Sequence, residues 1–454
     1  MSLSERAALP ARLLDALSVL FLLAAAAAPG LALTARTGAW LPLLGTSAAL
    51  GALRHLLYPR PSLLSRLAGL CGDLADPLER RAALVALGSR LAILVVGGTV
   101  VAALDYPPQP DRYRVSRTAV LNLPARFDAG GYVAVARHGY THLADAAERR
   151  RRIVFFPAFP IAMRLAGEML MAPGRVLAAP RWLDNDDTRA TWGGVLVALL
   201  CFTRASALLV RLAGVRLAGN RAIGLRAAVL MAAWPFAVPF SAPYAEPLFL
   251  LCVVSAVLAL HDGRVWHAGL WGLLAGLTLP NGWALSFGLG VALIPQFVGA
   301  RRAGAPPRAL SPDARHQSWT VLIAAAAAAI GTLGFSVWAW RVTGDPLAWS
   351  NAISIAGLDA ASPPALLGAL GMLALTPLVA RTAGIDLAMF SLAFLAAAIV
   401  TSPASMGRST AVLFPVFLTV ATRLSPRQSM VAAGAFAIYQ AWLAAAFFRW
   451  MPVP

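Results

Sequence analysis

The chain has 454 residues, of which 59% are hydrophobic and 13% are charged, and its formal net charge is +18 at pH 7. Soluble domains contain about 25% charged residues, so the composition excludes a protein that folds mainly in water. The positive charge could indicate a nucleic-acid partner, but lysine is absent and no separate basic domain is present. Membrane topology explains the arginine excess more simply, and no nucleic-acid partner is predicted.

Apolar stretches near the length of about 20 residues that a membrane-crossing helix needs recur along the whole chain. The first, 13–33, follows Arg6 and Arg12 and ends in alanines, as a signal sequence does. Because more such stretches follow, we interpret it as a retained signal anchor. Further spans are predicted at 38–58, 83–104, 190–212, 223–241, 247–261, 264–281, 283–298, 319–341, 363–380, 385–400, 408–422 and 429–448. The predicted fold is an all-α polytopic membrane protein with about 11 to 13 transmembrane helices.

The chain is predicted to form one membrane domain in three parts. Residues 1–104 contain the N-terminal transmembrane helices, 105–189 form a large outer loop, and 190–454 form the rest of the bundle. Within the loop, Phe155 to Met171 is short and carries Arg164 and Glu168, so we interpret it as an interfacial helix that does not cross the membrane.

Arginines predict the orientation, because short basic loops stay in the cytoplasm. Four basic loops fall on one side if the N-terminus is cytoplasmic, and they contain Arg60, Arg66, Arg80 and Arg81, then Arg211, Arg216 and Arg221, then Arg301, Arg302, Arg308 and Arg315, then Arg423 and Arg427. The long segment 105–189 then lies outside, although it is also rich in arginine. Long loops tolerate this charge. Because 105–189 is the only sizeable polar region of the sequence, chemistry is predicted on the non-cytoplasmic face.

Neither the cysteines nor the acidic residues give a firm metal site. Cys71, Cys201 and Cys252 are odd in number and far apart, so no disulfide framework is predicted. The run Asp184 to Asp187 has alternating carboxylates that could bind a divalent cation. Because Asp187 and Thr188 stand where the next helix begins, we favour helix capping there. No cofactor is predicted, and a divalent metal is the alternative.

Several polar and aromatic segments stand out in the loops assigned to the outer face. The long loop reads Arg126-Phe127-Asp128-Ala129-Gly130-Gly131-Tyr132, then His138-Gly139-Tyr140, then Phe155-Phe156-Pro157-Ala158-Phe159-Pro160. Later segments read Ser241-Ala242-Pro243-Tyr244-Ala245-Glu246, Leu277-Thr278-Leu279-Pro280-Asn281-Gly282, Gly344-Asp345-Pro346-Leu347, and Gly407-Arg408 before Phe414-Pro415. In this order they resemble the glycosylphosphatidylinositol mannosyltransferase II (PIG-V-like) family. Phe127 replaces the usual Trp of that family, and Leu279 replaces a frequent Arg.

This resemblance implies a glycosyltransferase of the membrane C-type (GT-C) fold with a mannosyltransferase-like activity, and our hypothesis for its mechanism is a single inverting displacement. Such an enzyme takes a hexose, mannose by family likeness, from a polyprenyl-phosphate donor. It passes the sugar to a hydroxyl of a lipid or glycan acceptor outside the cytoplasm. The arginine-only, alanine-rich composition is bacterial in style, so we expect a multi-pass protein of the cell membrane and an envelope acceptor.

Asp128 is the predicted catalytic base. An alcohol that attacks an anomeric carbon must lose its proton, and a carboxylate within hydrogen-bond reach can accept it. An aspartate before Ala-Gly-Gly is also typical of a helix start, where its side chain would cap backbone N–H groups. Because the other similar segments are present, we favour catalysis.

Glu246 and Arg408 complete the predicted mechanism. Glu246, at an outer helix end, would assist the base or the acceptor, and the alternative is a solvated carboxylate. Tyr244 beside it indicates the rim of a pocket. Arg408 opens an apolar helix on the outer side and is predicted to face the lipid phosphate, and the alternative is an anchor at the membrane interface.

The remaining candidates are weaker. His138, Tyr140 and Asn281 could bind sugar hydroxyls, satisfy their own backbone groups or line packed helix ends. Asp345 could contact substrate or form a turn. The run Arg149 to Arg152 is expected to contact membrane lipid headgroups without specificity.

Two other classes of protein remain as alternatives. A polyprenyl-lipid flippase would keep the fold without the base, and a transporter would place ionisable residues near the middle of the membrane. Arg204, Arg226 and Glu246 fall near predicted helix ends, which favours the transferase. A soluble type of nucleotide-sugar transferase is excluded, because no glycine-rich phosphate loop follows a strand.

Overall fold

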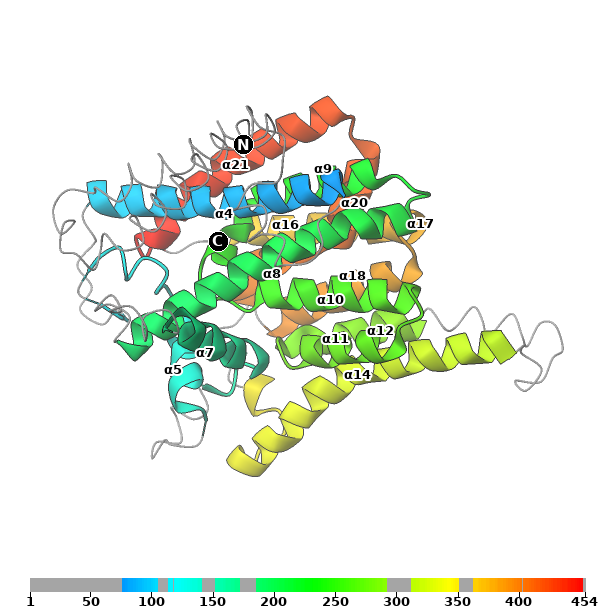
Figure 1. Cartoon of the computed structure of the whole chain (residues 1–454), viewed down its shortest axis with the longest axis horizontal. Coiled ribbons are helices and arrows are strands. Elements are labelled where there is room, and N and C mark those ends of the chain that lie inside the picture. Colours follow the sequence, from blue (N-terminus) through cyan, green and yellow to red (C-terminus); the bar gives the residue numbers. More distant parts are fainter. Residues whose placement is uncertain are drawn as a thin grey trace, which may run out of the picture.

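A computed structural model describes residues 76–104, 113–116, 118–140, 152–171, 185–291, 312–350, 362–401 and 403–451. The spans predicted at 13–33 and 38–58, Cys71, Asp184 and residues 149–151 lie outside this part of the chain. The described part is built of helices and contains no strand (Figure 1).

Several of these helices are long and apolar enough to cross a membrane. Four pass this test alone, namely α4 (Pro77–Ala103), α8 (Asp186–Arg216), the Ala325–Thr343 part of α14 (Pro312–Thr343) and α21 (Pro426–Phe448). The number rises to 7 if each of three bent helix pairs forms one span. The predicted class of all-α polytopic membrane protein is thereby confirmed. About 11 to 13 crossings were predicted. The described residues contain fewer helices than this that are long and apolar enough to cross a membrane.

Three predicted straight spans are bent helix pairs instead. The bends are 83° between α9 (Arg221–Ala233) and η3 (Pro235–Ser241), 41° between α16 (Pro363–Ala374) and α17 (Thr376–Thr382), and 54° where η7 (Pro403–Ser405) and α19 (Met406–Ala411) meet α20 (Phe414–Arg423). In each pair a proline is the first or second residue of the second piece: Pro235, Pro377 and Pro415. Proline cannot donate a backbone hydrogen bond and disfavours helical geometry in the residue before it, so a continuous helix ends at these points.

Helix α8 lies in the middle of the bundle. It packs against α4 and α9 on one side and against α10 (Glu246–His261) on another (Figure 1). Of the apolar stretch of α8 that is long enough to cross a membrane, 67% is buried inside the protein, compared with 28% of the corresponding stretch of α4. Phe202, Leu209 and Leu212 of α8 are fully buried in the main hydrophobic core. The outer helices instead expose apolar side chains, as membrane-facing helices do.

The second half of the bundle forms a layer beside α10. Helix α11 (Val265–Gly276) packs against α10 and α14, and α12 (Ala284–Val291) packs against α14 and α18 (Ile385–Thr401). A short turn, η4 (Pro280–Trp283), joins α11 to α12. A Cβ atom at Gly276 would stand 2.0 Å from the backbone oxygen of Ala328, so glycine is needed for this close approach of α11 and α14.

The predicted outer loop contributes two short helices, α5 (Ala129–His138) and α7 (Ala158–Met171), which lie at one end of the bundle (Figure 1). Helix α7 packs along α8. Its other face exposes Ile161, Leu165 and Met169, with 59%, 60% and 72% of each residue accessible. These residues are four positions apart and form one apolar stripe. Its place at the membrane interface stays a prediction.

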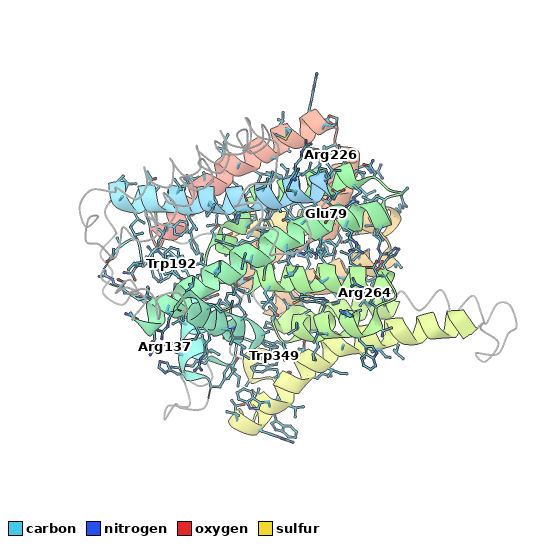
Figure 2. The ribbon with its side chains drawn as sticks, viewed as in Figure 1. Glu79, Arg137, Trp192, Arg226, Arg264 and Trp349 are labelled. Atoms are coloured by element: carbon cyan, nitrogen blue, oxygen red, sulfur yellow. The ribbon has the colours of Figure 1, made fainter. Side chains whose placement is uncertain are left out.

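The end of the bundle opposite α5 and α7 carries a group of ion pairs (Figure 2). Arg221 contacts Glu79, Arg211 and Arg264 contact Asp262, and Arg216 contacts Asp386. The prediction that Arg204 lies near a helix end is wrong, because α8 continues beyond it to Arg216. The predicted span stopped too early because arginine and glycine lower the hydropathy of the last turns.

Candidate functional site

Three of the predicted site residues meet at one point although they come from distant parts of the chain. Asp128 precedes α5, Glu246 opens α10 and Arg408 lies in α19. Nη1 of Arg408 donates to Oδ2 of Asp128 at 2.5 Å, and its Nε lies 2.9 Å from Oε1 of Glu246. One guanidinium therefore holds two carboxylates together.

Asp128 stands at the N-cap position of α5, but its side chain makes no capping hydrogen bond. The carboxylate is turned toward Arg408 instead, and 40% of the side chain is exposed. The capping alternative for Asp128 is therefore wrong. An accessible carboxylate held by an arginine can accept a proton from an incoming hydroxyl.

Glu246 is much less accessible than Asp128. Only 4% of its side chain is exposed, although it begins a helix on the predicted outer side. Its Oε2 atom is buried and has no hydrogen-bond partner among the described residues. Buried carboxylate oxygens normally have a partner, so this oxygen is, within the described part of the chain, an unsatisfied hydrogen-bond acceptor next to Arg408. A solvated carboxylate at this position, the predicted alternative, is excluded by its burial.

Tyr244 contacts both the segment that contains Asp128 and the guanidinium of Arg408. Its hydroxyl donates to the backbone oxygen of Arg126 at 3.1 Å and accepts from the backbone N–H of Asp128 at 3.3 Å. The guanidinium carbon of Arg408 lies 5.3 Å from the centre of the Tyr244 ring, within the range of a cation–π interaction. Burial raises the pKa of the Tyr244 phenol well above its usual value, so the phenol stays protonated.

Tyr132 forms the aromatic wall behind this tyrosine. The two ring centres are 6.1 Å apart, and Tyr132 also contacts Phe155 and Phe159 at 4.7 and 5.1 Å. Burial raises the pKa of the Tyr132 phenol as well. These rings form an apolar cluster beside Tyr244, and electrostatic interactions are stronger in such surroundings than in water.

His138 and Tyr140 lie away from the three charged residues. His138 is exposed at the other end of α5, about 15 Å along the helix from Asp128. The hydroxyl of Tyr140 donates to the backbone oxygen of Phe155 at 2.5 Å, and its ring packs on Phe335 and Trp338 of α14. Tyr140 therefore ties the loop to α14, and the structure does not bring it to Asp128.

Asn281 and Asp345 belong to turns. Asn281 lies in η4 and is buried with 7% exposure. Oδ1 of Asp345 accepts from the backbone N–H of Leu347 at 2.9 Å, which is the pattern of an aspartate turn. This contact agrees with the turn alternative for Asp345.

The acidic run before α8 is tied to neighbouring arginines. Asp186 and Asp187 both contact Arg137, and Asp186 also contacts Arg189. The capping prediction named the wrong residues, because Asn185 accepts from the backbone N–H groups of Asp187 and Thr188. An asparagine oxygen fills the same role as the expected carboxylate and hydroxyl.

Arg126 and Tyr132 were not predicted as parts of the site. Both belong to the segment that contains Asp128, and both are buried. The four-residue spacing of Asp128 and Tyr132 would have placed them on the same side of a helix. No feature of the sequence indicated that Arg126, two residues before the predicted base, is buried.

The fold and these contacts define a polytopic α-helical membrane protein with a carboxylate–arginine–carboxylate site at one end. Comparison with known proteins shows which proteins the chain is similar to in sequence. The chain is 30% identical over 166 residues to GPI alpha-1,6-mannosyltransferase 2 of Rattus norvegicus, which covers 36% of this chain and 30% of that protein. The same protein of Mus musculus is 30% identical over 158 residues, 35% of this chain and 29% of the relative.

The protein of that name from Cricetulus griseus is also 30% identical, over 160 residues. These matches confirm the resemblance seen in the loop segments. The chain matches less than a third of the length of these relatives. No family model matches the chain.

Proposed function

We propose that the chain is a membrane glycosyltransferase. It transfers a hexose from a polyprenyl-phosphate-linked donor to a hydroxyl of a lipid or envelope-glycan acceptor on the non-cytoplasmic face of the membrane. The names of the relatives support mannose as the sugar. The observation that carries the proposal is the meeting of Asp128 and Glu246 on Arg408.

Asp128 acts as the general base. The acceptor hydroxyl gives its proton to the carboxylate while its oxygen forms a bond to the anomeric carbon. The bond from that carbon to the phosphate oxygen breaks at the same time, so the configuration inverts and the lipid phosphate leaves with the electron pair. General base catalysis contributes a factor of about 10²–10⁴ to the rate.

Glu246 orients the reacting groups. Its free Oε2 atom accepts a hydrogen bond from a hydroxyl of the sugar or the acceptor. A site that offers a buried acceptor discriminates strongly against a substrate that lacks the matching hydroxyl. This role needs no proton transfer by Glu246.

Arg408 serves both acids and the leaving group. Its contacts with Asp128 and Glu246 use two of the five N–H donors of a guanidinium. The remaining donors are available to a phosphate oxygen. The N-termini of α5 and α10 add partial positive charge beside the two acids, which reduces repulsion of an anionic leaving group.

The proposal is tested with labelled donors in membranes that contain the chain and in matched membranes that lack it. One donor is a mannosyl phosphate of a short polyprenyl alcohol, and the other is a nucleotide diphosphate mannose. We expect transfer of label, or hydrolysis when no acceptor is present, only from the lipid-linked donor. Consumption of neither donor above the control, or of the nucleotide donor alone, would contradict the proposal.

A further inference from the structure

Arg126 lies two residues before the proposed base and is almost fully buried, with 1% exposure. Its Nε donates to the backbone oxygen of Phe448 at 2.8 Å. Phe448 is the last residue of α21, where backbone oxygens have no partner within the helix. The side chain of Arg126 therefore caps the carboxyl end of a helix that lies 322 positions later in the sequence.

The same arginine also fixes its own loop. Its Nη1 donates to the backbone oxygens of Asn122 and Ala125. The Trp450 ring covers the guanidinium, with 5.4 Å between the ring centre and Cζ. Arg126 thus joins the loop before α5 to the end of α21 through several contacts made by one side chain.

The residue between Arg126 and Asp128 is in a strained conformation. Phe127 has a φ angle of +48°, which is uncommon for any residue other than glycine. Its ring packs against Phe447 and Trp450, with ring centres 5.3 and 5.2 Å apart. Such a conformation persists where the surroundings over-determine it. Here the end of α21 supplies those contacts.

The strained turn sets the direction of Asp128. The backbone oxygen of Arg126 accepts from the hydroxyl of Tyr244, and the backbone N–H of Asp128 donates to the same hydroxyl. These bonds fix the peptide groups on both sides of Phe127. The carboxylate of Asp128 then points to Arg408 and not to the N-terminus of its own helix.

We propose that Arg126 is a positioning residue that uses the carboxyl end of α21 as an anchor to aim Asp128 at Arg408. The effect of Arg126 on kcat rests on the proposed function. Its structural consequence, the fixed direction of residue 128, does not depend on which reaction occurs.

The kinetic test compares Arg126→Ala and Arg126→Lys with the native chain. We expect Arg126→Ala to lower kcat by a factor of about 10², because small misplacements of a catalytic group cost that much. The KM for the donor should stay unchanged. Arg126→Lys keeps one donor for the Phe448 oxygen and should fold and lose less. In the Asp128→Asn background, Arg126→Ala should cause no further loss of kcat, because the group that it positions is gone.

Arg226→Ala is the matched control. Arg226 also donates to a backbone oxygen at a helix end, that of Leu424 at 2.7 Å, but lies at the other end of the bundle (Figure 2). We expect kcat per folded protein to stay at the native level. Equal kcat losses for Arg126→Ala and Arg226→Ala, a change in KM alone, or an additive loss in the Asp128→Asn background would overturn the proposal.

A second readout separates this proposal from the proposed function. Asp128→Cys is labelled with a membrane-impermeant maleimide with and without Arg126→Ala, and with Arg226→Ala as control. We expect faster labelling only with Arg126→Ala, because the turn is released. Equal rates in all three proteins would overturn the positioning role, even if the native chain transferred no sugar.

Discussion

Arg408 holds two carboxylates of different accessibility, and this arrangement determines how the site responds to mutation. Glu246 is buried, so removing the guanidinium leaves a buried carboxylate without its cation. We expect Arg408→Met to destabilise the protein by about 3–5 kcal/mol, the range for breaking a buried pair by removing one partner. Thermal unfolding of the native chain and of Arg408→Met in detergent measures this loss of stability.

The compensating variant and the control use the same measurement. Arg408→Met with Glu246→Leu should regain most of the lost stability, because no buried charge remains. Arg264→Ala removes an arginine that contacts Asp262 with 53% of its side chain exposed, and should cost about 0–1 kcal/mol. A double variant no more stable than Arg408→Met alone would contradict this explanation.

The residues of the site were predictable from the sequence to different extents. Asp128, Tyr244, Glu246 and Arg408 were all expected on one face, and the structure brings them into contact. His138 was expected there too, but position along a helix separates residues that are close in sequence. Sequence order alone does not say which of the segments face each other.

At the scale of elements, the apolar stretches predicted within the described residues match helices because hydropathy marks burial in lipid or protein alike. The 247–261 and 385–400 stretches correspond to α10 (Glu246–His261) and α18 (Ile385–Thr401). The bends were missed because hydropathy carries no information on direction. Pro235, Pro377 and Pro415 were the available signals for these breaks.

The close packing of α7 on α8 requires glycine at position 193. A Cβ atom at Gly193 would stand 2.5 Å from the backbone oxygen of Met163 and the backbone nitrogen of Gly167. Backbone atoms cannot move aside as a flexible side chain can. We therefore expect Gly193→Ala to destabilise the protein by about 1–3 kcal/mol, the usual cost of overpacking. Thermal unfolding in detergent checks this value.

Gly434→Ala in α21 is the control for that prediction. No atom lies within 4 Å of a Cβ built at Gly434. Alanine favours the helix over glycine there, so stability should rise by about 0.5–1 kcal/mol. If Gly193→Ala had the same effect as Gly434→Ala, the close approach of α7 and α8 would be wrong.

On the scale of the whole molecule, charge is distributed between two different ends. Asp128, Glu246 and Arg408 gather at the end with α5. Glu79 and Arg264, which are labelled in Figure 2, lie at the other end and take part in the ion pairs there. The positive-inside rule predicts that the second end faces the cytoplasm. The site would then face away from the cytoplasm.

Single cysteines test this orientation. His138 at the end of α5 and Asn220 between α8 and α9 are both exposed. In a chain whose native cysteines are replaced by alanine, we expect an impermeant maleimide to label His138→Cys in intact cells. Asn220→Cys should be labelled only after the membrane is opened. The reverse pattern would place the site in the cytoplasm and exclude the proposed orientation.

The class of the whole molecule was predictable from composition, because few charged residues and recurring apolar stretches leave no other stable solution than a helix bundle in a membrane. The arrangement of the bundle was not predictable in this way. The central place of α8 depends on packing between helices that are far apart in the sequence, as α8 with α10 and α11 with α14 show. The anchoring of the Asp128 loop on α21 is another such long-range contact.

The most direct test of the central claim is sugar transfer by Asp128→Asn, with Asp262→Asn at the opposite end as the matched control. Label from a mannosyl polyprenyl phosphate is followed in membranes with equal amounts of folded protein. We predict that Asp128→Asn lowers turnover by a factor of about 10²–10⁴, the contribution of a general base, and that Asp262→Asn keeps native turnover. Native turnover by Asp128→Asn would contradict the assignment of this carboxylate as the base.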